Sequence, residues 1–213
     1  MIIKSFQGGY DKNLCYVIWC EKTKYAALID ASVEVSEINE YILSNKLVLS
    51  KIFITHTHHD HIAYIYDWKH LYPSINIYCS LKTNKQKFDF IKLDNNQVIS
   101  IGLDFIIAID TPGRFYDSMC FWNDKRLFLF TGDTIFVGRT GRTVSSQSNI
   151  EDLYISLYDK LLKLNQDTKI YPGHHYGYKK SIKIKENIIL SPFFTCNSLE
   201  EFQKVMQNFE KNR

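Results

Sequence analysis

The sequence predicts an α+β fold in which β-sheets pack together and are flanked by helices. Short apolar runs of four to eight residues, rich in β-branched and aromatic side chains, recur through most of the 213 residues. Segments with an apolar position every three or four residues interrupt these runs, as expected for helices that cover a sheet. The length suits one domain over residues 1–213, and no internal repeat or break in composition divides the chain.

The apolar runs are too short for most helices and are separated by polar breaks such as E-K-T-K and N-D-K. Breaks of this length are typical of hairpin turns, so we expect most of the strands to be antiparallel. The predicted strands cover residues 14–19, 25–30, 51–55, 75–79, 105–110, 118–122, 126–130 and 168–172.

Three segments have a helical pattern. In residues 34–45 the apolar side chains form one stripe. In residues 149–164, Asn149 is a predicted N-cap and apolar side chains follow on one face. The last helix begins at Ser198, which has the spacing of a capping box to Glu201. The stripes predict helix faces that pack on the core.

Composition excludes several classes of protein. Hydrophobic residues make up 45% of the chain and charged residues 23%, as in an ordinary globular domain. The net charge of +3 comes from scattered lysines, so we expect no nucleic-acid partner. No apolar run approaches the roughly 18 residues of a membrane span, and the first residues lack the features of a signal peptide. Five cysteines without a C-x-x-C pair suit buried reduced thiols, so we expect a cytoplasmic protein with no membrane partner.

Histidine is concentrated in two places. Six of the seven histidines fall at 56–61 and 174–175. The first cluster follows the predicted strand 51–55, and a loop that leaves a strand can aim consecutive side chains at one point. The cluster places four side chains of the metal-ligand type within six residues: His56, His58, Asp60 and His61. This spacing predicts a metal site.

Further motifs accompany the histidine cluster, which reads T-H-T-H-H-D-H. They are L-I-D at 28–30, T-P-G at 111–113, F-T-G-D at 130–133 and Y-P-G-H at 171–174. The series resembles the metallo-β-lactamase superfamily, whose signature is T-H-x-H-x-D-H. The stretch L-F-T-G-D-T-I-F-V-G-R-T-G-R-T is similar to the glyoxalase II and persulfide dioxygenase branch, and the tail from residue 191 resembles persulfide dioxygenases in particular. The resemblance implies a four-layer αβ/βα sandwich with a metal site at one edge, between two sheets.

The resemblance also implies roles for individual residues. A first metal site would take His56 and His58, a second would take Asp60, His61 and His174, and Asp133 would bridge them. The implied cofactor is zinc, one or two ions per chain, with iron as the alternative. A zinc pair lowers the pKa of a bridging water toward neutrality, and Asp60 is expected to orient that water and carry its proton. Asp30 is expected either to orient a ligand histidine or to cap a strand end.

The sequence departs from the family at one ligand. The family's T-P-G-H motif reads T-P-G-R here, so Arg114 stands where the first site expects its third ligand. A guanidinium has no lone pair for a metal. In one interpretation, metal binds only at the second site, and Arg114 is a catalytic residue that holds a substrate carboxylate or the developing oxyanion. Alternatively, a weak first metal binds only with substrate, or the chain is an inactive relative that keeps one structural metal.

Substrate recognition is expected from the G-R-T-G-R-T stretch at 138–143. Arg142 matches the cationic residue with which glyoxalase II-like proteins hold a carboxylate, and the alternative is an arginine that fixes the loop. Arg114 and Tyr176 are the other candidate substrate-binding residues.

The resemblance therefore implies a hydroxyacylglutathione hydrolase-like thioesterase, a metal-dependent hydrolase of a small anionic thioester or ester that acts as a monomer or homodimer. Two alternatives are a persulfide dioxygenase that uses iron and a metal-binding protein without catalysis. Persulfide dioxygenases hold their iron partly with the T-P-G histidine, which is Arg114 here, so hydrolysis is favoured over oxygenation.

Overall fold

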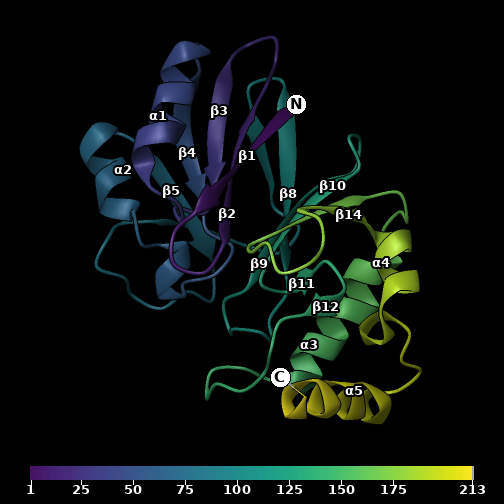
Figure 1. Ribbon diagram of the computed structural model, residues 1–213. Helices are drawn as coiled ribbons and strands as arrows, with labels where there is room; N and C mark the ends of the chain where they lie inside the picture. Colours follow the sequence, from purple (N-terminus) through teal and green to yellow (C-terminus); the bar gives the residue numbers. More distant parts are fainter. Residues whose placement is uncertain (213) are drawn as a thin grey trace.

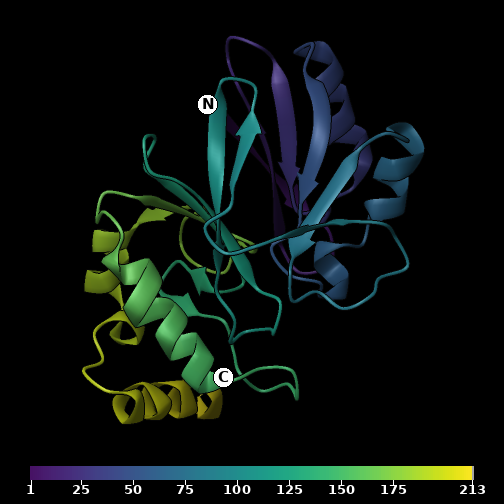
Figure 2. The same cartoon turned by 180° about the vertical axis from the view of Figure 1, so that it is seen from behind.

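Two β-sheets pack face to face, and helices cover both outer surfaces, in the computed structural model, which describes residues 1–212 (Figures 1 and 2). Separate apolar clusters lie between the sheets and beneath the helices on either side. The layers therefore run helix, sheet, sheet, helix. The predicted α+β class and the four-layer αβ/βα sandwich are confirmed.

The first sheet has the strand order β1-β2-β3-β4-β5-β6. Its first three strands are antiparallel neighbours, whereas β3, β4, β5 and β6 are parallel. Helices α1 (Val35–Ser44) and α2 (Ile65–Leu71) connect parallel strands and cover the outer face. The strands are β1 (Ile2–Gly8), β2 (Asn13–Trp19), β3 (Tyr25–Ile29), β4 (Val48–Phe53), β5 (Asn76–Ser80) and β6 (Ile91–Leu93).

The second sheet has the order β14-β13-β10-β9-β8-β7, and only β10 and β13 are parallel neighbours. Helices α3 (Ile150–Ile155), α4 (Ile184–Leu190) and α5 (Leu199–Lys211) cover its outer face. The strands are β7 (Val98–Ile101), β8 (Asp104–Asp110), β9 (Met119–Asn123), β10 (Phe128–Gly132), β13 (Lys169–Pro172) and β14 (Ile182–Lys183). A small hairpin of β11 (Ile135–Phe136) and β12 (Arg139–Thr140) follows β10.

Strand β2 is buried on both faces. Cys15 and Val17 pack in the layer beneath α1 and α2, whereas Leu14 packs between the sheets. Burial on both faces explains why this strand is a continuous apolar run rather than an alternating one. The layer beneath α3 and α5 is similar in kind and includes Leu153 and Phe202.

The strand directions differ from the prediction in the first sheet. Over residues 1–212, seven of the eleven strand pairs are antiparallel, so the expectation of mostly antiparallel strands is confirmed. It does not extend to β3, β4 and β5, because helices rather than hairpins connect these strands. Several short elements are absent from the sequence prediction: helices α2 and α4, and strands β1, β6, β7, β11, β12 and β14.

The predicted helix over 149–164 is interrupted. Its α-helical part ends at Ile155, a π-helical turn follows over Ser156–Lys160, and a 3₁₀ turn completes the segment. The Asn149 side chain accepts hydrogen bonds from the next turn, which confirms the predicted N-cap. At α5 the Ser198 hydroxyl accepts from the Glu201 amide, but the Glu201 carboxylate accepts from Asn197 rather than completing the expected capping box.

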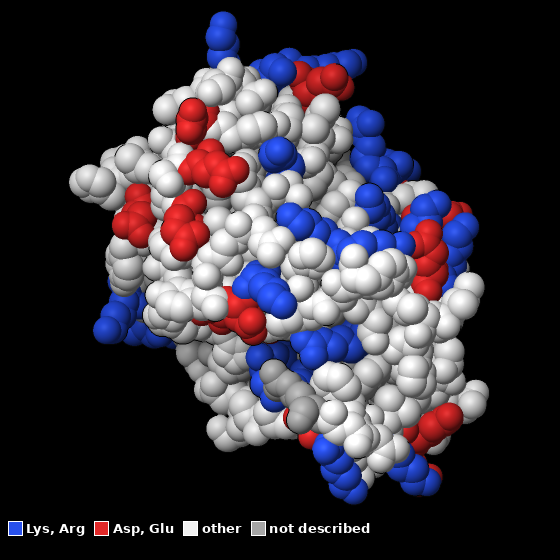
Figure 3. All heavy atoms as spheres, viewed as in Figure 1, with Lys and Arg blue, Asp and Glu red and all other residues white. Residues whose placement is uncertain are grey.

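The burial of the cysteines and the distribution of surface charge agree with the expectations from composition. All five cysteines are buried and free. Acidic and basic side chains are both spread over the face shown in Figure 3. Among residues 1–212, none of the helices has the length and apolar character needed to cross a lipid bilayer.

Candidate metal centre

The candidate metal ligands lie just beyond the carboxyl ends of strands. Asp30 follows β3 and His56 follows β4, and these strands are parallel, so both residues lie at the same edge of the first sheet. Asp133 follows β10 and His174 follows β13, which are parallel neighbours in the second sheet. Ligand candidates that are distant in sequence therefore meet at one edge of the sandwich.

Four donor atoms converge in a group that we call the second site: Asp60 Oδ2, His61 Nε2, Asp133 Oδ1 and His174 Nε2. His61 Nε2 lies 3.2 Å from His174 Nε2, 3.3 Å from Asp133 Oδ1 and 3.5 Å from Asp60 Oδ2. His174 Nε2 lies 3.3 Å from each of the two carboxylate oxygens. A tetrahedral zinc ion with metal–donor distances of about 2.0–2.1 Å separates its donors by about 3.3 Å. The spacing therefore fits a zinc-sized ion.

Hydrogen bonds turn both imidazoles so that a lone pair faces the second site. His61 Nδ1–H donates to Asp30 Oδ2 at 2.8 Å, and His174 Nδ1–H donates to the carbonyl of Asp11 at 2.8 Å. In the neutral rings Nε2 is then unprotonated, and the two lone pairs face each other. Asp133 Oδ1 is buried without a hydrogen-bond partner among residues 1–212. Buried acceptors that face one another without a donor require a cation, and a metal ion meets that requirement.

The charges around the second site lead to the same conclusion. Burial opposes protonation of His174, but the carboxylates of Asp133 and Asp60 outweigh it and raise the pKa of His174 to about 9. Burial also opposes protonation of His61, but Asp30 and Asp133 raise its pKa well above the usual value. Burial would raise the pKa of Asp60, yet the two histidines hold it below its ordinary value. The carboxylates stay ionised and attract either protons or a metal cation.

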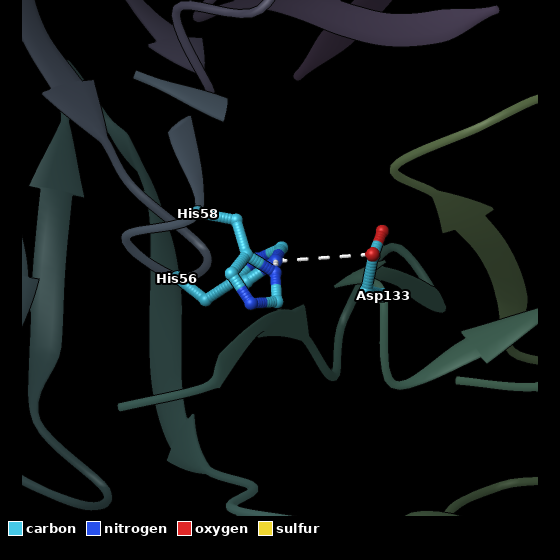
Figure 4. A group of neighbouring side chains, drawn as sticks. All are labelled: His56, His58 and Asp133. Carbon is cyan, nitrogen blue, oxygen red and sulfur yellow. Dashed lines mark hydrogen bonds and ion pairs between the residues drawn. The ribbon is translucent and has the colours of Figure 1, made fainter. Parts of the chain in front are cut away.

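The first site consists of His56, His58 and Asp133. His56 Nδ1–H donates to the Thr55 hydroxyl at 3.2 Å, because that hydroxyl donates its own proton to Asp30. His56 Nε2 therefore carries the lone pair, and His58 Nδ1–H donates to it at 2.8 Å. Figure 4 shows the rings of His56 and His58 facing Asp133. His56 Nε2 lies 3.8 Å from Asp133 Oδ2. The two histidines of the first site therefore form a hydrogen bond with each other. In the second site both Nδ1–H groups donate elsewhere, so the two Nε2 lone pairs face each other.

Arg114 lies against the first site. Its Nε is 3.4 Å from Asp133 Oδ2, and its side chain is only 19% exposed. Burial lowers the pKa of His58 to about 4, and the charge of Arg114 adds to this effect. His58 is therefore neutral at pH 7 beside a permanent positive charge.

The turn between β1 and β2 supports the second site, and the sequence analysis missed it. Asn13 is fully buried, and its Nδ2 donates to Asp60 Oδ2 at 2.8 Å. Asn13 Oδ1 accepts from the amides of Tyr10 and Asp11, which holds the turn whose carbonyl orients His174. The signal was G-G-Y-D-K-N before a buried strand, but asparagine and aspartate are also ordinary turn residues.

Asp117 is a second residue that the sequence analysis did not single out. Its carboxylate accepts from the amide and hydroxyl of Thr57, at 3.2 and 2.7 Å, and from the hydroxyl of Thr83 at 2.9 Å. Thr57 lies between His56 and His58, so Asp117 fixes the loop that carries both. The only indication of Asp117 in the sequence was its position in the D-S pair that follows T-P-G-R-F-Y.

The predicted substrate-binding residues lie in different surroundings. The ring of Tyr176 stacks on that of His174, with centroids 4.8 Å apart, and its hydroxyl donates to Asp11 Oδ2 at 2.6 Å. Arg142 is 37% exposed and contacts Glu210 of α5, with Nη1 3.6 Å from Oε2. Glu210 also lines a cavity of about 650 Å³ between α5 and the loop before α3. Substrate binding by Arg142, Arg114 and Tyr176 stays a prediction.

The chain matches a known protein family over most of its length. The family described as the metallo-beta-lactamase superfamily matches residues 8–174. This range is most of the chain and contains every candidate metal ligand. The chain therefore belongs to the metallo-beta-lactamase superfamily, as its motifs implied.

Individual relatives are similar over different shares of the chain. The probable polyketide biosynthesis zinc-dependent hydrolase BaeB of Bacillus velezensis is 28% identical over 193 residues, which are 89% of this chain and 85% of that protein. The hydroxyacylglutathione hydrolase of Francisella tularensis subsp. novicida is 36% identical over 137 residues, which are 64% of this chain but only 54% of that protein. The crystal structure of ETHE1 from Myxococcus xanthus has a TM-score of 0.88 and 28% identity, over 98% of this chain and 91% of that one.

Proposed function

We propose that this chain is a metal-dependent hydrolase of a small anionic thioester or ester. The observation that carries the proposal is the second site, where two imidazole lone pairs and two carboxylates converge with the spacing of zinc ligands. The names of two relatives, a zinc-dependent hydrolase and a hydroxyacylglutathione hydrolase, support the same class of reaction. Zinc is the proposed metal.

The residues that would hold the ion are Asp60, His61, Asp133 and His174. When bound, a metal ion there supplies a Lewis acid that polarises the carbonyl and makes water more acidic. Asp30 and the Asp11 carbonyl keep both histidines in the tautomer that presents Nε2. Asp60 is 29% exposed, whereas His61 and Asp133 are buried, so solvent and substrate reach the centre on the side of Asp60.

Asp60 is the candidate catalytic carboxylate. Its Oδ2 accepts from Asn13, and its Oδ1 has no partner among residues 1–212, so that oxygen is free to orient the attacking water and accept its proton. In the reaction water adds its oxygen to the carbonyl carbon, the carbon–sulfur bond breaks, and the proton passes to the leaving thiolate. The products are an acid and a thiol.

Thiol release from zinc-loaded protein with S-lactoylglutathione tests this proposal. Asp60→Asn keeps the side-chain shape, and its turnover should fall by on the order of 100-fold or more. Asp67→Asn, an exposed carboxylate on α2, is the matched control and should retain full turnover. A folded, zinc-loaded wild type that hydrolyses neither anionic thioesters nor esters would refute the proposal and favour metal binding without catalysis.

A second candidate is persulfide oxygenation by iron, which the resemblance of the tail from residue 191 favours. It predicts oxygen consumption by iron-loaded protein in the presence of a glutathione persulfide. We place it second because Arg114 replaces the histidine that this chemistry uses as an iron ligand.

A further inference from the structure

Arg114 stands at the position of the T-P-G-H motif where the resemblance implies a metal-ligating histidine. Contacts within the fold hold its side chain beside the first site. The aliphatic part of its side chain lies on Gly141, where a Cβ would come within 2.8 Å of Arg114 Cδ and 2.9 Å of Cγ. Its Nε pairs with Asp133 Oδ2, the oxygen of that carboxylate on the side of the first site. The same Cβ would clash first with the backbone oxygen of Asp133, so glycine at 141 allows the close approach to Asp133 and leaves the arginine undisturbed beside it.

The residues of the first site do not fit a tightly bound metal ion. Asp133 Oδ2 is already neutralised by Arg114, and the lone pair of His56 Nε2 accepts a hydrogen bond from His58 Nδ1. A divalent ion there would also meet the repulsion of a permanent guanidinium in a mostly buried site. The second site differs, because Asp133 Oδ1 is buried without a hydrogen-bond partner among residues 1–212, and His61 and His174 both donate through Nδ1, which leaves Nε2 of each neutral ring to face the site.

The outer part of the guanidinium is free. Among residues 1–212 Asp133 is the polar partner of Arg114, and it meets only Nε. Nη1 and Nη2 therefore keep four N–H donors in the fork that binds a carboxylate or oxyanion with two parallel hydrogen bonds.

We propose that the chain binds a single metal ion, at the second site, and that Arg114 takes the place of the second ion and binds the anionic group of the substrate. The substrate half of this inference rests on the proposed hydrolase function, whereas the metal count does not.

The metal count is measured by elemental analysis of protein that was saturated with zinc and then desalted. The wild type should hold one zinc per chain. Arg114→His restores an imidazole at the family's ligand position and removes the charge, so it should hold two. Arg126→His is the matched control, because it changes an exposed arginine that pairs with Asp104 rather than with a candidate metal ligand. This variant should hold one zinc per chain. Two tightly bound ions in the wild type, or one in Arg114→His, would overturn the single-metal inference.

Anion binding is measured with two thiols that differ in one group. Mercaptoacetate offers zinc a thiolate and offers Arg114 a carboxylate, whereas 2-mercaptoethanol lacks the carboxylate. Wild-type protein should bind mercaptoacetate at least about tenfold more tightly, as expected for hydrogen bonds between charged groups. Arg114→Gln should abolish this preference while keeping one zinc per chain, which also shows that it is folded. An unchanged preference in Arg114→Gln would overturn the role of Arg114 in anion binding.

These measurements separate the inference from the proposed function. One zinc per chain with an Arg114-dependent preference, but no hydrolysis, would support the inference and refute the hydrolase. Hydrolysis by a wild type with two zinc ions would do the reverse.

Discussion

Asp30→Asn changes one oxygen of a buried carboxylate to an NH₂ group and leaves the shape nearly unchanged. Asp30 Oδ1 accepts from the Thr55 amide at 2.8 Å, and Oδ2 accepts from the Thr55 hydroxyl at 2.9 Å and from His61 Nδ1 at 2.8 Å. An asparagine that keeps the bond to the amide turns its NH₂ toward His61 Nδ1–H, so two donors face each other. His61 relieves this conflict by moving its proton to Nε2. The second site then loses a lone pair.

The expected cost follows from these contacts. Removing a group that orients a metal-ligating histidine typically lowers metal affinity by about 10–100-fold, or about 1.4–2.8 kcal/mol. We expect the upper end of this range, because the pair is buried and the substitution removes both a charge and the correct tautomer. Backbone strain adds nothing, since the φ of 60° at Asp30 is one that asparagine tolerates as well as aspartate.

Competition with a chelator of known zinc affinity measures this loss. The matched control is Asp104→Asn, which also removes a mostly buried carboxylate but one that pairs with the N-terminal amine and Arg126 rather than with a histidine. It should bind zinc at the second site as tightly as the wild type. A folded Asp30→Asn variant with wild-type zinc affinity would refute the tautomer argument.

Three further predictions concern pH and stability. Because the pKa of His174 is raised to about 9 without metal, zinc binding near pH 7 should release protons, which calorimetry in buffers of different ionisation enthalpy detects. The same raised pKa stabilises the metal-free fold fully below 6.5, and this contribution is lost as pH rises toward about 9, so urea unfolding should show a falling stability over that window. A flat profile, or zinc binding without proton release, would contradict this assignment. Asn149→Ala removes the cap of α3 and should lower the free energy of unfolding by about 1 kcal/mol, and an unchanged urea midpoint would count against the cap.

The candidate site was partly predictable because its ligands cluster in sequence. His56, His58, Asp60 and His61 fall within six residues, and no structure is needed to expect a metal there. Asp133 is a single residue at a strand end, and only the resemblance to a family singled it out. His174 belongs to the second histidine cluster, but its role as a ligand also came from the resemblance. The prediction that Asp30 contacts a histidine is confirmed by its hydrogen bond to His61.

The supporting residues were not predictable for a physical reason. Asn13 meets Asp60 across 47 positions, and the Asp11 carbonyl meets His174 across 163. Every residue has a backbone carbonyl, so the residue type does not indicate which carbonyl orients a histidine. A buried asparagine that supports a site cannot be distinguished in the sequence from an ordinary turn asparagine.

In the fold, too, features that depend on neighbouring residues were predictable, whereas features that depend on residues distant in sequence were not. Strands such as β2 and helices such as α5 follow from the pattern of apolar residues, which is local. Strand direction does not, because a parallel pair depends on the helix between its strands. Helix α2 is only seven residues long, and its buried side chains are Ile65 and Trp68, too few to establish a helical period.

The distance in sequence between the parts of the metal centre also bears on folding kinetics. Contacts across 163 residues form late, because the chain must first close a large loop. A metal ion that binds only the completed centre stabilises the native state more than the transition state for folding. It should therefore slow unfolding and leave the folding rate nearly unchanged. Metal would thus set the lifetime of the folded chain, and the metal-free protein would open to proteases more often.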